Sequence, residues 1–257
     1  MDYIFVYCDI KHMEISQLFL RSLWAVNSKC RVLYYGCNID SKDIFKVWKG
    51  EIEFYKVNPK EFYWRIATHK IELLSRVPLK TNDRIIVFDP DILLQDDPFK
   101  MFDNNHDMYY TTRHYKCKYP VNGGVFGFKG TEEGRKIITF YNEQIHKKDW
   151  KPYKKFMKGY SDTDGVAHYD MTNWCIGQDW LCCVHIYGLP FDSSVKDVGP
   201  AWNYCPDYGS TQFTAKFNQV KQDLFDKIGD KRYKVLHFKG AMKNEMFLAA
   251  ERMSACN

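Results

Sequence analysis

Residues 84–94 read Arg-Ile-Ile-Val-Phe-Asp-Pro-Asp-Ile-Leu-Leu, an apolar run followed by two carboxylates, Asp89 and Asp91. A β-branched and aromatic run of this length is typical of a buried strand, whose polar end then lies at the edge of the sheet. In extended chain, Cα atoms two residues apart are separated by about 7 Å. Both carboxylates can therefore approach one hard divalent cation and the phosphate oxygens bound to it. Taken alone, however, an Asp-x-Asp after a strand more often forms a turn or a helix cap.

Around this stretch, the first 90 residues alternate strand-like and helix-like segments, which predicts a βαβ-type, largely parallel sheet. The expected strands are 3–7, 31–36, 51–57 and 84–88, and the expected helices are 15–26, 43–48 and 64–76. Ligands bind outside the carboxyl ends of such strands, which predicts a nucleotide-type pocket between Cys8-Asp9 and Asp89-Pro90-Asp91. No glycine-rich dinucleotide or P-loop signature follows any of these strands.

The second half of the sequence is less regular. Residues 119–128 predict a turn that enters a strand, and the paired Gly123 and Gly124 allow the backbone to approach a ligand closely. Further expected elements are helices over 132–148 and 174–187 and a late strand over 233–238, with an irregular region over 147–173.

The composition is that of one globular domain. The chain has 257 residues, 45% of them apolar, and no low-complexity linker or repeat divides it. The net charge of +5 comes with lysines spread along the chain, so nucleic acid is not an expected partner. The N-terminus begins directly with a strand-like run and no apolar stretch is long enough to span a membrane, which predicts a soluble protein. Nine cysteines without a Cys-x-x-Cys pair predict reduced thiols and a cytoplasmic location.

One cysteine-histidine cluster could bind zinc. It consists of Cys182, Cys183 and His185, with Cys175 nearby. The spacing fits no standard zinc pattern, and the apolar residues between them favour packing in a buried helix.

Four short motifs follow one another along the chain: Asp89-Pro90-Asp91, Asn122-Gly123-Gly124-Val125, Gly177-Gln178-Asp179 and His237-x-x-Gly240-x-x-Lys243. In order and spacing they resemble the GT-A glycosyltransferases, most closely glycosyltransferase family 8, the group of glycogenin and the lipopolysaccharide galactosyltransferases. The resemblance implies one Rossmann-like GT-A domain, with a central, mostly parallel mixed sheet flanked by helices. Residues 1–91 would form its nucleotide-binding half, and residues 92–257 its acceptor-binding half and C-terminal motif.

The resemblance also implies a metal site. Asp89, Asp91 and His237 would hold a manganese ion that bridges the diphosphate of a nucleotide sugar, with magnesium as the alternative. Mixed carboxylate and imidazole ligands suit manganese somewhat better. Gly240 would be approached by phosphate, and Lys243 would pair with it.

Other residues match the donor-binding positions of the family. Lys70 corresponds to a basic residue that reaches the donor phosphates or sugar, and Arg65 is the alternative. Asn122 and Gly123 correspond to the element that lines the donor sugar. Cys8 and Asp9 correspond loosely to the turn that contacts uridine.

The segment that faces the reacting sugar departs from the family pattern. The family has Gly-Asp-Gln, whereas this chain has Gly177-Gln178-Asp179, with the acidic and amide residues exchanged. Asp179 is the preferred catalytic residue, and Gln178 is the alternative. A carboxylate near a helix N-terminus, which favours the helix dipole, is the structural explanation for Asp179.

These residues predict a metal-dependent hexosyltransferase that uses a UDP-sugar donor and a carbohydrate or glycoconjugate acceptor, with retention of configuration implied by the resemblance. Two alternatives stay open. A sugar nucleotidyltransferase would also use a carboxylate-bound cation, but it would show a glycine-rich basic loop where the chain has Cys8-Asp9-Ile10-Lys11-His12. The second alternative is a protein of this fold that binds sugar or nucleotide without turnover.

Overall fold

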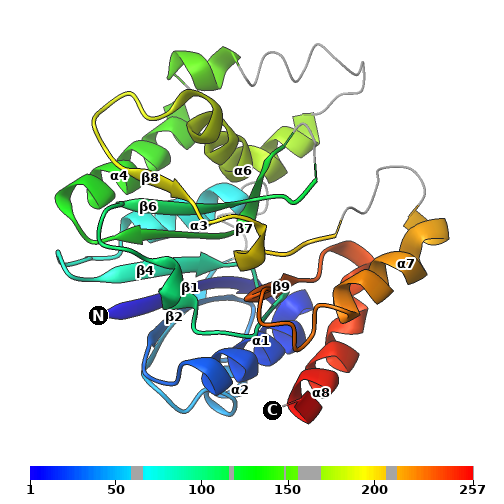
Figure 1. Cartoon of the computed structure of the whole chain (residues 1–257). Coiled ribbons are helices and arrows are strands. Elements are labelled where there is room, and N and C mark those ends of the chain that lie inside the picture. Colours follow the sequence, from blue (N-terminus) through cyan, green and yellow to red (C-terminus); the bar gives the residue numbers. More distant parts are fainter. Residues whose placement is uncertain (59–65, 116–118, 148, 156–168, 207–212, 257) are drawn as a thin grey trace.

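The computed structural model describes residues 1–58, 66–115, 119–147, 149–155, 169–206 and 213–256. Their main sheet has seven strands in the order β3-β2-β1-β4-β7-β6-β8 (Figure 1). In chain order these strands are β1 (Asp2–Asp9), β2 (Arg31–Cys37), β3 (Ile52–Val57), β4 (Arg84–Phe88), β6 (Met108–Thr112), β7 (Val121–Lys129) and β8 (Val195–Asp197). Strands β3, β2, β1 and β4 are parallel, whereas β7 is antiparallel to β4 and β6. The predicted α/β fold with a mostly parallel mixed sheet is confirmed.

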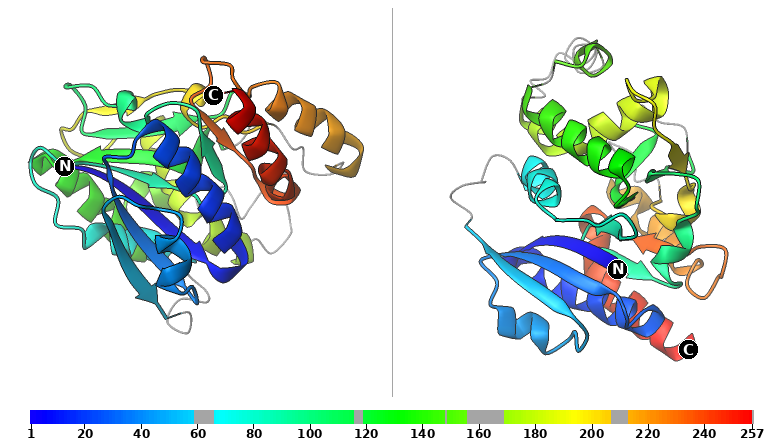
Figure 2. Two further views of the ribbon diagram at one scale, coloured as in Figure 1. Left: turned by 90° about the horizontal axis from the view of Figure 1, so that it is seen from below. Right: turned by 90° about the vertical axis from the view of Figure 1, so that its left-hand side faces the viewer.

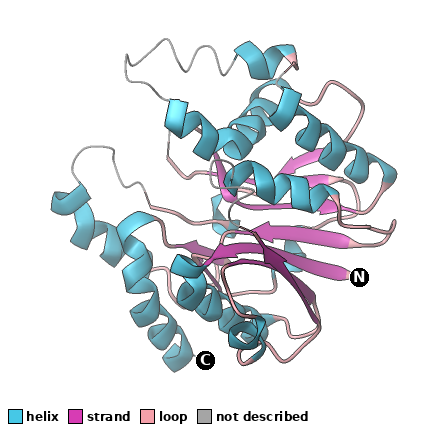
Figure 3. Cartoon of the chain, turned by 180° about the vertical axis from the view of Figure 1, so that it is seen from behind, coloured by secondary structure: helices cyan, strands magenta, loops and turns pink. Residues whose placement is uncertain are grey.

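Helices cover both faces of the sheet (Figures 1 and 3). One face carries α1 (Met13–Val26), α2 (Ser41–Phe45), α7 (Phe213–Phe225) and α8 (Met246–Cys256), and the other carries α3 (Ile66–Ser75), α4 (Glu132–Lys147) and α6 (Tyr169–Tyr187). The alternation of side chains along β1 produces the two cores. Ile4 and Val6 lie in the core under α1 and α8, whereas Phe5 and Tyr7 lie in the core under α3, α4 and α6. In the described ranges, no helix combines the length and the apolar character that a membrane crossing requires.

A second, two-stranded sheet brings distant parts of the chain together. Strand β5 (Ile92–Leu94) pairs antiparallel with β9 (Val235–His237), and Ile92 lies opposite His237. Both strands are buried, and β5 packs on α1, which in turn contacts α8 near the C-terminus (Figure 2). The late segment of the chain is thereby held beside the turn that follows β4.

Several predicted boundaries were wrong. The helix expected over 43–48 is α2, Ser41–Phe45, because the Asp40 side chain accepts a hydrogen bond from the Lys42 backbone and caps the helix earlier. Helix α6 begins at Tyr169 and not at residue 174, so the end of the expected irregular region is helical. Residues 148 and 156–168 of that region lie outside the described residues, as does the start of the helix expected from residue 64. Strands β5, β6 and β8 were not predicted.

We expect the substitution Ile86→Ala to lower the free energy of unfolding by about 2–5 kcal/mol, because it leaves a cavity in the middle of the sheet. Ile86 is fully buried on β4. Ile186→Ala is the matched control, since Ile186 is 49% exposed and its loss should change the free energy by at most about 0.5 kcal/mol. Urea unfolding monitored by tryptophan fluorescence measures both values. Equal effects would contradict the placement of β4 at the centre of the core.

Candidate functional site

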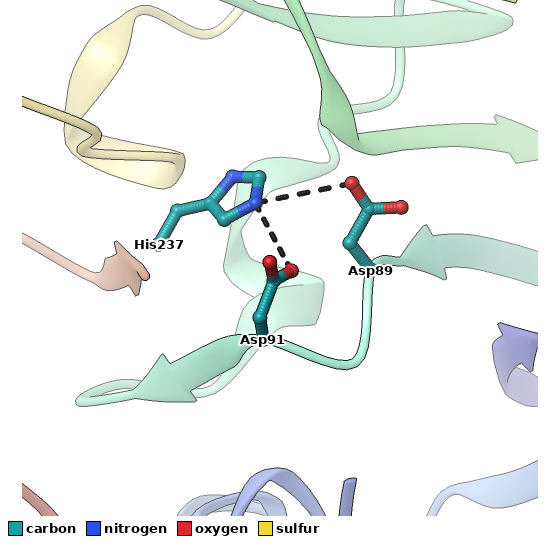
Figure 4. Close-up of side chains that lie close together, drawn as sticks. All are labelled: Asp89, Asp91 and His237. Atoms are coloured by element: carbon teal, nitrogen blue, oxygen red, sulfur yellow. Dashed lines mark ion pairs between the residues drawn. The ribbon is translucent and has the colours of Figure 1, made fainter. Parts of the chain in front are cut away.

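Three potential metal ligands converge where β4, β5 and β9 meet. Asp89 follows β4, Asp91 precedes β5, and His237 ends β9 (Figure 4). The pairing of β5 with β9 brings His237 next to Asp91, and the Phe238 amide donates to the Asp91 carbonyl oxygen at 2.8 Å. One ligand atom from each of the three side chains lies within 4.8 Å of the others. The structure thus brings together the ligand set predicted from sequence.

Asn203 fixes the orientation and the tautomer of His237. The Asn203 amide donates to Thr111 Oγ1 at 2.9 Å and to the Asn122 carbonyl oxygen at 3.2 Å, so its Oδ1 faces His237 Nδ1 at 2.8 Å. Because an amide oxygen only accepts, Nδ1 carries the ring proton. Nε2 then presents its lone pair to Asp91 Oδ1 at 3.2 Å and Asp89 Oδ2 at 3.8 Å.

This arrangement fits a divalent cation. Among the described residues, His237 Nε2 is buried without a hydrogen-bond partner. A lone pair that faces two carboxylates is repulsive unless a cation lies between them. Two carboxylates and one neutral imidazole are ligands suited to manganese, and the buried hydrogen bond from Nδ1 is the usual support for a metal-binding histidine.

The protonation states also suit metal binding. Burial lowers the pKa of His237, which keeps its ring neutral. Burial by itself would raise the pKa of both carboxyls, but the Lys70 ammonium counteracts this shift at Asp89, and the Lys243 ammonium counteracts it at Asp91. Both pKa values therefore lie below the ordinary range, and both groups are carboxylates, the form that binds metal.

Two lysines flank the carboxylates. Lys70, on α3, places Nζ 2.8 Å from Asp89 Oδ1, and Lys243 places Nζ 3.2 Å from Asp91 Oδ2. Lys243 lies on the 3-10 helix η5 (Gly240–Glu245), and Gly240 at φ +57° begins this helix in a conformation that favours glycine. The structure thus brings the predicted phosphate-binding lysines to either side of the candidate metal site. The side chain of the alternative residue, Arg65, lies outside the described part of the chain.

Residues 122–124 lie within strand β7, and Gly124 packs against His237. Asn122 is fully buried, and its Oδ1 accepts from Lys239 Nζ at 2.9 Å and from the Gly124 amide at 3.3 Å. A Cβ atom built on Gly124 would lie 2.2 Å from His237 Cε1, so only glycine leaves space for the imidazole. Gly124 therefore leaves the space that the His237 imidazole occupies, and Asn122 Nδ2 lies 3.5 Å from Nδ1 of the same ring.

Gln178 and Asp179 point to different surroundings. Gln178 Oε1 accepts from the Gly123 amide at 3.3 Å, which places Gln178 beside residues 122–124 of β7. Asp179 is only 1% exposed on the buried side of α6. The pKa of Tyr153 is raised mainly by burial and secondly by the negative charge of Asp179. Asp179 therefore lies near this core tyrosine. The structure thus brings Gln178, the alternative of the sequence prediction, to the site.

The remaining predicted residues lie around β1 and within α6. The Cys8 side chain is buried, and burial raises the pKa of its thiol to about 12. Asp9 is half-buried at the end of β1 and accepts from His12. Cys182 and Cys183 are fully buried in α6, and His185 is exposed and contacts Tyr110 at 2.8 Å. The Cys175 side chain lies outside the described residues.

Sequence reasoning missed Asn203 and His12. Asn203 follows a short 3-10 helix, Pro200–Trp202, and His12 ends another, Ile10–His12. Their partners are His237 and Lys243, which lie far away in sequence. Only the order of Asp9 and His12 after the first strand offered a signal, since an aspartate three residues before a histidine can orient its ring.

No protein-family model and no curated protein sequence matches the chain. Solved structures with a similar fold are glycosyltransferases. GlyE of Streptococcus pneumoniae TIGR4 gives a TM-score of 0.60 at 12% identity, and the match covers 97% of this chain but only 61% of GlyE. The galactosyltransferase LgtC, in complex with donor and acceptor sugar analogs, gives 0.56 at 14% identity and covers 98% of this chain and 96% of LgtC. An active-site mutant of LgtC, in which glutamate replaces a glutamine, gives 0.52 at 15% identity with the same coverage. The chain therefore has the GT-A fold of these glycosyltransferases.

We expect Gly124→Ala to weaken the binding of manganese about 10- to 100-fold, because the added methyl group displaces His237. Gly123→Ala is the matched control. A Cβ atom there would meet Gln178 Cβ at 3.3 Å and touch no candidate ligand, so manganese affinity should stay close to that of the wild type. Isothermal titration with manganese alone measures both affinities. Unchanged binding by Gly124→Ala would contradict the role of this glycine.

Proposed function

We propose that the protein is a metal-dependent glycosyltransferase that transfers a hexose from a UDP-sugar to an acceptor hydroxyl. One observation carries this proposal. The Asp89, Asp91 and His237 side chains converge at the carboxyl end of β4, and an ammonium group lies beside each carboxylate. Within a GT-A fold, this combination suits a cation and the diphosphate that it would bind. A carbohydrate or glycoconjugate is the proposed acceptor, and the resemblance to family 8 supports retention of configuration.

Asp89, Asp91 and His237 would hold the cation. Manganese is preferred over magnesium because an imidazole is part of the ligand set. When bound, the cation would supply Lewis-acid stabilisation of the negative charge that develops on the departing diphosphate. Asn203 and Gly124 keep the imidazole in the orientation that this requires.

Lys70 and Lys243 would stabilise the leaving diphosphate directly. Each ammonium contacts one ligand carboxylate, Asp89 or Asp91, which places it within reach of the cation's other ligands. Their side chains are 15% and 26% exposed, so they are partly shielded from water. Charge-assisted hydrogen bonds in such surroundings are stronger than exposed ones, and they favour the charge of the transition state.

Gln178 is proposed to face the reacting sugar in place of Asp179. It lies against Gly123, next to the β7 residue that packs against His237, whereas the Asp179 side chain is buried on the core side of α6. A glutamine of LgtC is an active-site residue, since its replacement by glutamate is described as an active-site mutation. An amide can donate to a sugar hydroxyl and accept from another, and this orients the ring.

Asp91→Asn tests the proposal. This change removes a metal ligand's charge but keeps its shape, and we expect release of UDP from the donor to fall about a hundredfold or more. A panel of UDP-hexoses is incubated with manganese, with magnesium and with chelator, and free UDP is measured. Asp192→Asn is the control because Asp192 is an exposed loop residue, and it should turn over at the wild-type rate.

Undiminished, metal-dependent activity of Asp91→Asn would contradict the proposal. Binding of UDP and manganese without turnover of any donor would instead identify a binding protein of this fold. Release of pyrophosphate from a nucleoside triphosphate and a sugar phosphate would identify a nucleotidyltransferase.

For the reacting sugar, we expect Gln178→Ala to lower kcat about a hundredfold with little change in manganese affinity. Asp179→Asn should keep kcat and lower the free energy of unfolding by about 1–3 kcal/mol, because it disturbs a buried polar contact. Steady-state kinetics and urea unfolding separate the two effects. A loss of kcat with Asp179→Asn at unchanged stability would restore Asp179 as the catalytic residue.

A further inference from the structure

A second series of polar contacts joins the end of β1 to the C-terminal motif. Asp9 Oδ1 accepts from the His12 amide at 3.1 Å and lies 2.6 Å from His12 Nδ1. On the other side of the ring, His12 Nε2 lies 3.0 Å from Lys243 Nζ, which is 231 residues away in sequence. Lys243 in turn contacts the Asp91 carboxylate. His12 is thus the link between the first strand and one of the proposed diphosphate-binding lysines.

These contacts determine the protonation of His12. A lysine ammonium only donates hydrogen bonds, so His12 Nε2 accepts from Lys243. Nδ1 then carries the ring proton and donates a hydrogen bond to the Asp9 carboxylate, which can only accept. A doubly protonated ring would bring two cations face to face. His12 is therefore neutral, and Asp9 selects the tautomer that can accept from Lys243.

Lys243 needs such a fixed acceptor. Its ammonium lies at the end of a flexible four-carbon chain, and holding it in one place costs side-chain entropy. Asp91 provides one contact, but Asp91 is also a proposed metal ligand, and a bound cation would repel the ammonium. The neutral Nε2 of His12 attracts Lys243 from another direction. Two of the three N–H groups are then used by His12 and Asp91, and one remains for a phosphate oxygen.

We propose that His12 is a positioning residue, held by Asp9, that keeps the Lys243 ammonium in place for the donor diphosphate. The proposal rests on the proposed function, in which Lys243 binds that diphosphate. It also gives Asp9, a residue predicted to contact uridine, a defined task through its bond to His12. His12 itself needs no contact with the substrate for this role.

Two substitutions of His12 test the proposal. His12→Phe keeps a planar ring but removes the acceptor, and the dissociation constant of UDP in the presence of manganese should rise about tenfold. His12→Gln places an amide oxygen near the position of Nε2, and it should restore most of the affinity. The His12 side chain is 31% exposed, so both variants should fold. Manganese affinity without UDP should stay unchanged in both, because His12 contacts no metal ligand.

A double-mutant cycle with Lys243→Met shows whether His12 acts through Lys243. If it does, His12→Phe has no further effect on UDP affinity once Lys243 is replaced. An equal loss in both backgrounds would mean that His12 acts independently of Lys243, which overturns the proposal. So would wild-type UDP affinity in His12→Phe.

A spectroscopic measurement separates this inference from the proposed function. The ¹⁵N chemical shifts of the His12 imidazole report which nitrogen carries the proton, with no donor present. We expect the Nδ1–H form in the wild type and a shift toward the other form in Asp9→Ala. An Nε2–H tautomer in the wild type overturns the role of His12 even if the enzyme is active. A wild-type protein with the expected tautomer that binds no UDP instead overturns the proposed function, and with it the role of Lys243.

Discussion

The candidate site depends on one short ladder of backbone hydrogen bonds, the pairing of β5 with β9. These strands are only three residues long, yet they bring His237 from the end of the chain to the turn that carries Asp89 and Asp91. The residues around the His237 imidazole fit the position that this pairing gives it. Gly124 lacks a side chain because the imidazole occupies that space, and Asn203 is buried because it holds the same ring. A shift in the register of β5 against β9 would move His237 away from Asp91 and so separate the candidate ligands.

The site combines charges that are costly to bury singly. Asp91 is 7% exposed and Asp89 is 32% exposed, and carboxylates removed from water in this way destabilise a fold unless cations compensate them. Lys70 and Lys243 supply this compensation in the protein itself, one for each carboxylate. A divalent cation would add further positive charge, and this excess would favour an anionic ligand such as a diphosphate. The same groups thus stabilise the unliganded fold and would attract an anionic ligand to the metal-bound site.

The local parts of this arrangement could be predicted from sequence, whereas its tertiary parts could not. The apolar run 84–88 identifies β4, and the alternation before it identifies the parallel half of the sheet. The His237 motif was recognised from its spacing to Gly240 and Lys243. Strands as short as β5 and β8 carry no periodicity, and the contacts of Asn203 and His12 join segments that only the fold brings together. The surroundings of Gln178 and Asp179 depend on the rotation of α6, whose polar and apolar residues alternate without a clear helical period.

The closure of β5 on β9 also affects how the protein acquires its fold. During synthesis β4 and the two aspartates that follow it emerge well before β9. The two carboxylates therefore exist for a time without their histidine partner. Contacts between such distant segments form slowly, because a long loop of chain has to be ordered first. A cation that binds only the completed triad draws the equilibrium toward the closed arrangement by mass action. The availability of metal ions in the cell would then influence the yield of folded protein as well as its turnover.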